Sequence, residues 1–206
     1  MNADLNSLRI ACCSCQDCEL SKRRTQVVFG EGDPHAPLVL VGEGPGAQED
    51  ESGRPFVGKA GKMLDNAILD AGLTRDSLYI CNTVKCRAAD WATGKPKNRP
   101  PTKQEVAECR KWLVPQLSMI SPEVILCIGG PSAKNLIDKS FMITKQRGLE
   151  FVSNLGVVAM ATLHPSYIQR LQRPGFDGGY NLLVKDIKKA WELACDRKEA
   201  RVKTCQ

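Results

Sequence analysis

The cysteines are the residues of this sequence whose spacing most directly predicts chemistry. Cys15 and Cys18 form a C-x-x-C pair, and Cys86 and Cys109 follow with 22 residues between them. Two such pairs can converge on one tetrahedral zinc ion or on an iron–sulfur cluster, and the spacing does not choose between these metals. Cys12 lies as far before Cys15 as Cys15 lies before Cys18, so Cys12 is a rival ligand.

The other cysteines have simpler interpretations. Cys81 and Cys127 fall inside apolar segments that predict strands, where a lone cysteine packs as a small hydrophobic residue. Cys13, Cys195 and Cys205 are expected to be surface or terminal thiols. The first thirty residues show no secretory signal, and in a reducing compartment clustered cysteines hold metal or do redox chemistry more often than they form disulfides.

Polar or glycine-rich residues follow four segments that predict strands, at 42–46, Asn82, 129–132 and 164–166. In open α/β sheets, ligands bind at the carboxyl ends of the strands. His164 in the last segment is a candidate functional residue, although half-exposed histidines also serve structural roles. The other histidine, His35, stands in a Gly/Asp/Pro turn and is expected to be solvated.

Two glycine motifs imitate nucleotide-binding loops without meeting their requirements. Residues 53–59 have the G-x-x-x-x-G-K spacing of a P-loop, but no strand precedes them and Ala60 replaces the Ser or Thr that holds magnesium. Residues 42–47 fit a relaxed G-x-G-x-x-A dinucleotide fingerprint, but a proline interrupts the turn and the next strand ends in Asn82 instead of an acidic residue. Neither motif predicts nucleotide binding here.

The composition predicts one globular domain. The chain has 206 residues, of which 42% are hydrophobic and 25% are charged. An excess of 29 Lys and Arg over 23 Asp and Glu is compatible with an anionic partner such as nucleic acid but does not require one. Without about twenty consecutive apolar residues there is no membrane span, so a cytoplasmic location is expected.

The residues singled out above must be positioned by alternating strands and helices. Apolar, β-branched runs predict strands at 37–41, 78–81, 124–128 and 157–161. Helical spacing predicts helices at about 60–71, 103–119, 131–138 and 181–195. The Pro-rich segment 87–101 and the segment 170–179 are expected to be exposed loops. This alternation favours an α/β domain with a central parallel sheet.

Six segments, taken in order, resemble the motif series of the family 4 uracil-DNA glycosylases, the iron–sulfur-containing branch of that superfamily. The order and spacing hold from about residue 15 to residue 193. The segments are CQDCEL at 15–20, GEGPGAQED at 42–50, GRPFVGKAG at 53–61, NTVKCR at 82–87, EVAEC ending at Cys109, and HPSYIQR at 164–170.

The resemblance implies a fold and a cofactor. The fold would be a three-layer α/β/α sandwich with a central, mainly parallel four-stranded sheet, in a single domain spanning 1–206. A [4Fe-4S] cluster would be held by Cys15, Cys18, Cys86 and Cys109. The cluster would then tie the Cys-rich segment 12–18 to the long loop 87–108.

The resemblance also implies an activity, in which deoxyuridine is flipped out of DNA and its N-glycosidic bond is hydrolysed to leave an abasic site. Glu43, Asn82 and His164 would be catalytic: Glu43 would position the attacking water, Asn82 would pair with the Watson–Crick edge of uracil, and His164 would bind its O2. Substrate contacts are implied for Asn82, His164, Gly42, Gly44, Pro45, Gly46, Asp50 and Phe56, whose ring would stack on the base.

DNA contacts are implied for Gly130, Ser132, Pro165, Ser166 and Arg170, with the last three in a loop that presses into the minor groove. The expected partner is uracil-containing DNA, single- or double-stranded, with no membrane partner and a monomeric chain. The competing interpretation is a catalytically altered iron–sulfur DNA-binding member of the same superfamily.

One departure from the family pattern lies between Cys86 and Cys109, where the connection is longer than usual. A related branch has a His in this region and becomes covalently trapped on its product, but the matching position here is Asn98, and an amide is a poor nucleophile. Ordinary turnover is therefore expected. The loop either contacts single-stranded DNA or is a disordered insertion, and its candidate contacts are Trp91, Lys95, Lys97 and Arg99.

Overall fold

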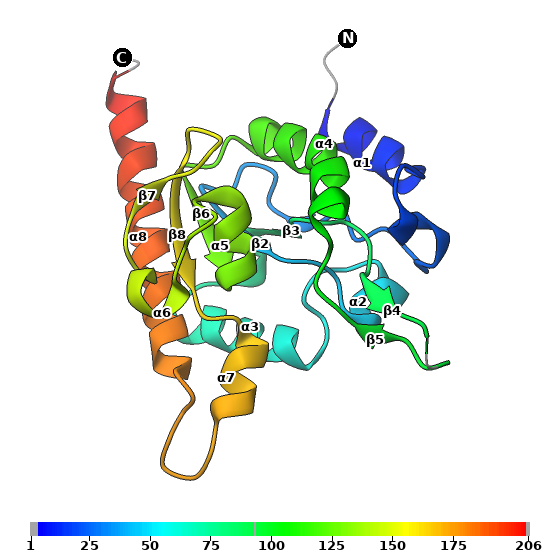
Figure 1. Cartoon of the computed structure of the whole chain (residues 1–206). Helices are drawn as coiled ribbons and strands as arrows, with labels where there is room; N and C mark the ends of the chain where they lie inside the picture. The colour runs from blue at the N-terminus through cyan, green and yellow to red at the C-terminus, as the bar shows by residue number, and fades with distance from the viewer. Residues whose placement is uncertain (1–3, 93, 205–206) are drawn as a thin grey trace.

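A six-stranded sheet forms the centre of the protein in the computed structural model, which describes residues 4–92 and 94–204 (Figure 1). The strands lie in the order β1-β3-β2-β6-β8-β7. Their bounds are β1 Glu31–Gly32, β2 Leu38–Gly42, β3 Tyr79–Asn82, β6 Val124–Ile128, β7 Phe151–Val152 and β8 Val158–Thr162. The four inner strands are parallel and match the four predicted strands, which confirms the central parallel sheet.

The expectation of four strands is wrong at the two edges of the sheet. β1 pairs with β3 and β7 pairs with β8, both in the antiparallel sense. Each edge strand is only two residues long, too short to give the apolar run or the alternation by which a strand is recognised.

Helices cover both faces of the sheet, which confirms the three-layer architecture. On β2, Leu40 packs into the layer of α3 (Lys59–Asp70) and α8 (Tyr180–Thr204), whereas Val41 packs against α4 (Lys103–Ile120) and α5 (Gly130–Leu136). Strands buried on both faces require continuous apolar sequence, and β2 and β6 have it. These four helices match the predicted ones, and α8 continues past the expected end at 195.

The segment 87–101, expected to be an open loop, contains an antiparallel hairpin, and α7 occupies residues expected to be loop. Within the hairpin, Ala89 lies opposite Asn98. α7 forms because Pro165 stands in the first helical turn, where its missing N–H costs little, and the side chain of His164 caps the helix. The elements without a sequence prediction are α1 Leu5–Cys13, α2 Ala47–Ser52, α6 Ile143–Gln146, α7 Pro165–Leu171, the 3-10 helices η1 Glu19–Lys22 and η2 Arg75–Ser77, and the hairpin strands β4 Ala89–Asp90 and β5 Lys97–Asn98.

The parallel register gathers the polar residues that follow the strands. Gly42 at the end of β2 lies opposite Asn82 at the end of β3. β8 runs in the same direction on the other side of β6. His164, which follows β8, therefore lies at the same end of the sheet as Gly42 and Asn82. Across residues 4–92 and 94–204, the helices are all too short or too polar to cross a membrane.

Candidate active site and cysteine centre

The carboxyl ends of the inner strands open into a cavity of about 510 Å³. A cavity of this size is ordinary for a small-molecule ligand and can accept a nucleobase with its sugar. Most of the predicted site residues line it, from the loop after β2, the end of β3, the segment before α3, and the cap and helix of α7. These residues are Glu43, Gly44, Pro45, Gly46, Phe56, Asn82, His164, Ser166 and Arg170.

His164 is held in a defined orientation at the start of α7. Its Nδ1 accepts a hydrogen bond from the backbone N–H of Ser166 at 3.1 Å and lies 2.8 Å from the Ser166 hydroxyl oxygen. Burial lowers the pKa of His164 to about 4, and the charge of Arg170 acts in the same direction. The imidazole is therefore neutral near pH 7, and because Nδ1 accepts from the N–H of Ser166, the ring proton lies on Nε2.

Asn82 is the last residue of β3 and is buried. None of the described residues forms a hydrogen bond with its side-chain amide, so donor and acceptor are both available to a ligand. Gly42 creates the space for this amide, because a Cβ at Gly42 would lie 2.3 Å from Oδ1 of Asn82 and 2.6 Å from the Phe56 ring. Gly42 thus shapes the cavity from behind without lining it.

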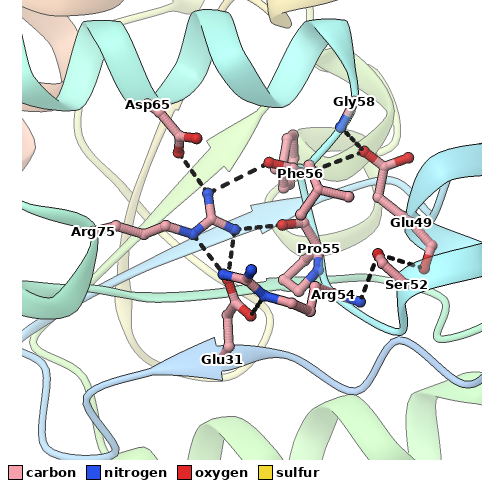
Figure 2. A network of polar contacts seen from close by, with 10 residues as sticks. Glu31, Glu49, Ser52, Arg54, Pro55, Phe56, Gly58, Asp65 and Arg75 are labelled. Atoms are coloured by element: carbon pink, nitrogen blue, oxygen red, sulfur yellow. Dashed lines mark hydrogen bonds and ion pairs between the residues drawn. The ribbon is translucent and has the colours of Figure 1, made fainter.

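Phe56 has a left-handed backbone, with φ of 52°, which non-glycine residues rarely adopt. Arg75 stabilises this conformation by donating to the carbonyl oxygens of Phe56 and of the preceding proline (Figure 2). Arg75 is itself oriented by Glu31 at 2.9 Å and Asp65 at 2.6 Å. The ring centroid of Phe56 lies 6.0 Å from that of His164. The ring is therefore fixed in one place on the cavity wall.

Glu49 holds two cavity loops together. Its Oε1 accepts hydrogen bonds from the backbone N–H groups of Val57 at 3.0 Å and Gly58 at 2.8 Å, and Figure 2 shows the second of these bonds. Its Oε2 accepts from the backbone N–H of Gly46 at 3.1 Å. One carboxylate thus joins the loop after β2 to the loop that carries Phe56.

Glu43 is a half-buried carboxyl group that lines the same cavity. Burial raises its pKa above the usual range for a glutamate. Its backbone carbonyl accepts a hydrogen bond from the N–H of Val84 at 3.1 Å, which fixes the start of the loop against the segment after β3. A carboxylate so placed can orient a water molecule within the cavity.

Four other predicted site residues do not line the cavity. Asp50 lies on the buried side of α2, and both of its carboxylate oxygens accept from the backbone N–H of Thr25. The Ser132 hydroxyl is buried and donates to the carbonyl of Val41 at 2.6 Å, so it has no access to a phosphate. Gly130 begins α5, and Pro165 is buried in the first turn of α7. Pro165, Ser166 and Arg170 therefore lie on a helix instead of the expected loop.

The hairpin of the long connection forms one wall of the cavity. Ala88, Asn98 and Arg99 line it. The side chain of Asn98 accepts from Nε of Arg87 at 2.8 Å. The guanidinium of Arg23 lies 5.5 Å from the ring centroid of Trp91, which attaches the hairpin to the N-terminal segment. The hairpin also borders the residue before α2, because a Cβ at Gly46 would lie 3.5 Å from Nδ2 of Asn98.

A second, small cavity is lined by five cysteines: Cys12, Cys15, Cys18, Cys86 and Cys109. The structure thus brings together all four predicted ligands and the rival Cys12. Cys86 follows β3, Cys109 lies on α4, and the other three come from the N-terminal segment. Cys81 and Cys127 are buried in the sheet, as expected for core residues. Cys13 is exposed and Cys195 half-buried, and Cys205 lies outside the described residues.

Comparison with known proteins decides the family. The model of the uracil DNA glycosylase superfamily matches residues 29–192. The chain belongs to this superfamily. It is 40% identical over 177 residues to the type-4 uracil-DNA glycosylase of Thermotoga maritima, covering 85% of this chain and 87% of the relative. It is also 40% identical over 193 residues to the type-4 uracil-DNA glycosylase of Archaeoglobus fulgidus, covering 90% of each chain.

The cysteine cavity of this superfamily member fits a bound iron–sulfur cluster. Cys86 Sγ accepts from Nη1 of Arg24 at 3.3 Å, and Cys109 Sγ accepts from the backbone N–H of Lys85 at 3.2 Å. Trp112 also lines the cavity, and its Nε1 is buried with no hydrogen-bond partner among the described residues. These donors suit thiolate or sulfide acceptors. In the described chain, no three His, Cys, Asp or Glu side chains are grouped for a single ion, and a cluster of several irons holds its ligands farther apart.

Glu49 and Arg75 shape the site of this uracil DNA glycosylase superfamily member, and neither could be singled out from the sequence. Glu49 lies within the quoted GEGPGAQED segment, and its place three residues after Gly46 is the one available signal. Arg75 has no local signal, because it lies nineteen residues after Phe56 and acts only through the tertiary fold. Arg99 was expected to contact single-stranded DNA or to lie in a disordered insertion, and Asn98 was expected to replace the His of a related branch; both residues line the cavity.

Proposed function

We propose that this chain removes uracil from DNA by hydrolysing the N-glycosidic bond of a deoxyuridine flipped into the cavity described above. The relatives named type-4 uracil-DNA glycosylase, which align with most of the chain, support this activity. The observation that carries the proposal is the meeting of Glu43, Phe56, Asn82 and His164 around one cavity. In the reaction, the oxygen of water bonds to C1′ of the sugar, and the bond from C1′ to N1 breaks with its electron pair going to uracil.

Asn82 and Phe56 would bind the base. The free amide of Asn82 offers one donor and one acceptor, the pattern that matches the O4 and N3–H of uracil and mismatches cytosine. The Phe56 ring would stack on the face of the base, and stacking of this kind is worth about 1–3 kcal/mol per base. The rigid hold of Arg75 on the Phe56 loop keeps this surface in place before the base arrives.

His164 would stabilise the departing uracil. Its neutral ring presents the Nε2 proton, because Nδ1 is occupied by the N–H of Ser166. A neutral donor suits O2 of the base, where negative charge develops as the glycosidic bond breaks. Donors fixed in this way are worth about 2.7–4 kcal/mol in a measured oxyanion hole.

Glu43 would orient the attacking water and stabilise the positive charge that develops on the sugar. Its carboxylate form is needed for both tasks, although burial raises its pKa. One proton of the water is shared with this carboxylate as the oxygen approaches C1′. The backbone of residues 44–46 closes the cavity on the same side.

Basic residues at the cavity rim would bind the DNA backbone. Lys59 and Arg170 both line the cavity, and no ion pair is found for either among the described residues. Backbone N–H groups at the start of α5, near Gly130, provide a further phosphate contact of the kind that helix termini make. Such contacts position the duplex without reading its sequence.

Cys15, Cys18, Cys86 and Cys109 would hold a [4Fe-4S] cluster, which when bound adds a redox-active group and a crosslink. Through their positions these residues would join the N-terminal segment to the end of β3 and to α4. That crosslink also borders the hairpin wall of the base cavity, because Ala88 packs in one apolar cluster with Cys86 and Cys109.

The test is incubation of purified protein with a uracil-containing oligonucleotide and its thymine-containing counterpart, followed by alkali. We expect cleavage at the uracil position alone, and we expect Asn82→Ala to abolish it while keeping the visible absorption of the cluster. Binding of uracil-containing DNA without cleavage would instead support the catalytically altered DNA-binding alternative.

A further inference from the structure

Lys85 is a buried cation that the proposed reaction does not use. Its side chain is 1% exposed, in the sheet-end segment between Asn82 and Cys86. Burying an ammonium group is costly unless partners replace the lost water. A lysine kept in such a place therefore implies specific partners and a role that an apolar side chain could not fill.

The ammonium of Lys85 has two hydrogen-bond acceptors and one aromatic neighbour. Nζ donates to the backbone carbonyl of Asn82 at 2.9 Å and to Oε1 of Gln116 at 2.5 Å. It also lies 5.7 Å from the ring centroid of Phe29. Gln116 is fully buried and fixed in turn, because its Nε2 donates to the carbonyl of Phe29 and to the hydroxyl of Tyr79. The ammonium is thus held rigidly against the residue that ends β3.

The same lysine borders the cysteine centre. Its backbone N–H donates to Sγ of Cys109, and Lys85 lines the cysteine cavity. Among the described residues it forms no ion pair with a carboxylate. The cysteine centre therefore supplies negative charge beside this buried cation when its deprotonated thiolates bind metal.

We propose that Lys85 is a positioning residue that couples the two sites. Its ammonium fixes the carbonyl of Asn82, and hence the direction of the Asn82 amide, while its charge offsets the anionic cluster. The inference rests on the proposed function, because it assigns the reading of uracil to Asn82. Loss of the cluster would leave the Lys85 charge uncompensated and would loosen the end of β3 that faces the base.

The test compares Lys85→Met, which keeps the length of the side chain and removes the charge, with a matched control, Lys111→Met. Lys111 also carries a positive charge near the cysteine centre, but it is partly exposed, pairs with Asp17 and has no contact with Asn82. For each protein we would measure iron per chain, the reduction potential of the cluster, kcat and KM on uracil-containing DNA, and the inhibition constant of free uracil.

For Lys85→Met with full iron content, we expect inhibition by free uracil to weaken and kcat/KM to fall, each by about tenfold or more, as for loss of a charged hydrogen bond. KM for DNA should change less than kcat, since the DNA contacts remain. The reduction potential should fall, because removal of a buried cation disfavours the more negative reduced cluster. Lys111→Met should keep wild-type uracil inhibition and kcat/KM.

A second variant keeps the proposal testable if Lys85→Met does not fold. Gln116→Met removes one acceptor and keeps the charge, so uracil inhibition should weaken while the potential stays close to that of the wild type. Wild-type uracil inhibition and kcat/KM in either variant at full iron content would overturn the coupling. An inactive wild type would refute the proposed function instead, and direct binding of free uracil by calorimetry, together with the potential, would then test Lys85.

Discussion

The backbone N–H of Ser166 donates a hydrogen bond to Nδ1 of His164 across 3.1 Å. This contact fixes the tautomer of the neutral imidazole and aims its Nε2 proton away from α7. The ring lies on the cavity wall together with Phe56 and Asn82. The residue that caps α7 is therefore also the one proposed to donate to the base.

The pH dependence of uracil release tests the protonation states assigned to the site. The pKa of His164 is lowered to about 4 by burial, so the imidazole stays neutral from pH 6 to 9. We expect kcat to show no inflection from His164 over this range and to fall on the acid side as Glu43, whose pKa burial raises, gains a proton. A kinetic pKa near 6.5 that disappears in His164→Asn would contradict this assignment.

Stability should fall as the solution is acidified through the range in which His164 resists protonation. An unfolded histidine titrates near 6.5, whereas the folded-state pKa is about 4, so the unfolded chain binds more protons between these values. The contribution of His164 is complete above pH 6.5 and is lost as the pH falls towards 4. The decrease in Tm from pH 7 to pH 5 should therefore be smaller for His164→Gln than for the wild type, and an equal decrease would count against the burial effect.

Glu49→Ala should distort the cavity, although Glu49 is not among the residues proposed to bind the base. The substitution leaves three backbone N–H groups, on Gly46, Val57 and Gly58, without their acceptor. Hydrogen bonds to a charged group contribute about 1.5–3 kcal/mol, so we expect a loss of about 2 kcal/mol in unfolding free energy and a fall in kcat.

The matched control for Glu49→Ala is Glu51→Ala on the same short helix, where the side chain is exposed and in no ion pair among the described residues. Denaturant unfolding and steady-state kinetics measure both effects. Equal behaviour of the two variants would rule out the role of Glu49 in joining the two loops.

Single cysteine substitutions decide which thiols hold the cluster. We expect Cys15→Ala, Cys18→Ala, Cys86→Ala and Cys109→Ala each to lose most of the iron and to lower Tm, since the crosslink between distant segments is lost. Cys12→Ala and Cys127→Ala should retain the iron. Iron content and visible absorption provide the measurement, and an iron-free Cys12→Ala beside an iron-loaded Cys15→Ala would transfer the ligand role to Cys12.

With Asn98 at this position, the protein should release its DNA product and should not become covalently trapped on it. Its side chain reaches the cavity wall and accepts a hydrogen bond from Arg87, but an amide cannot readily attack the sugar. After incubation with uracil-containing single strands, a denaturing gel should show no protein–DNA adduct. An adduct that survives denaturation would show that some group in this chain traps the product.

The inner strands could be predicted because buried parallel strands need continuous apolar sequence, and β2 and β6 show it without interruption. Since parallel strands end on the same side of a sheet, Glu43, Asn82 and His164 could also be placed together at the carboxyl ends of the strands. The edge strands could not be predicted, because two residues carry no periodic signal and their pairing is decided by the neighbouring strand.

The parts of the site that escaped prediction depend on contacts between distant segments. Arg75 supports Phe56 from beyond α3, and the Lys85 ammonium meets Gln116 across 31 residues of sequence. No local pattern encodes either contact. A lysine is usually found at the surface, and only the assembled fold provides the partners that make the burial of Lys85 acceptable.

The most direct measurement is the quantity of free uracil released from an oligonucleotide that contains a single deoxyuridine, determined by chromatography for the wild type and for Asn82→Ala. The proposed function predicts one uracil per deoxyuridine over many turnovers of the wild type, and at least a hundredfold slower release by the folded, iron-loaded variant. No release by the wild type, or equal release by the variant, would contradict it.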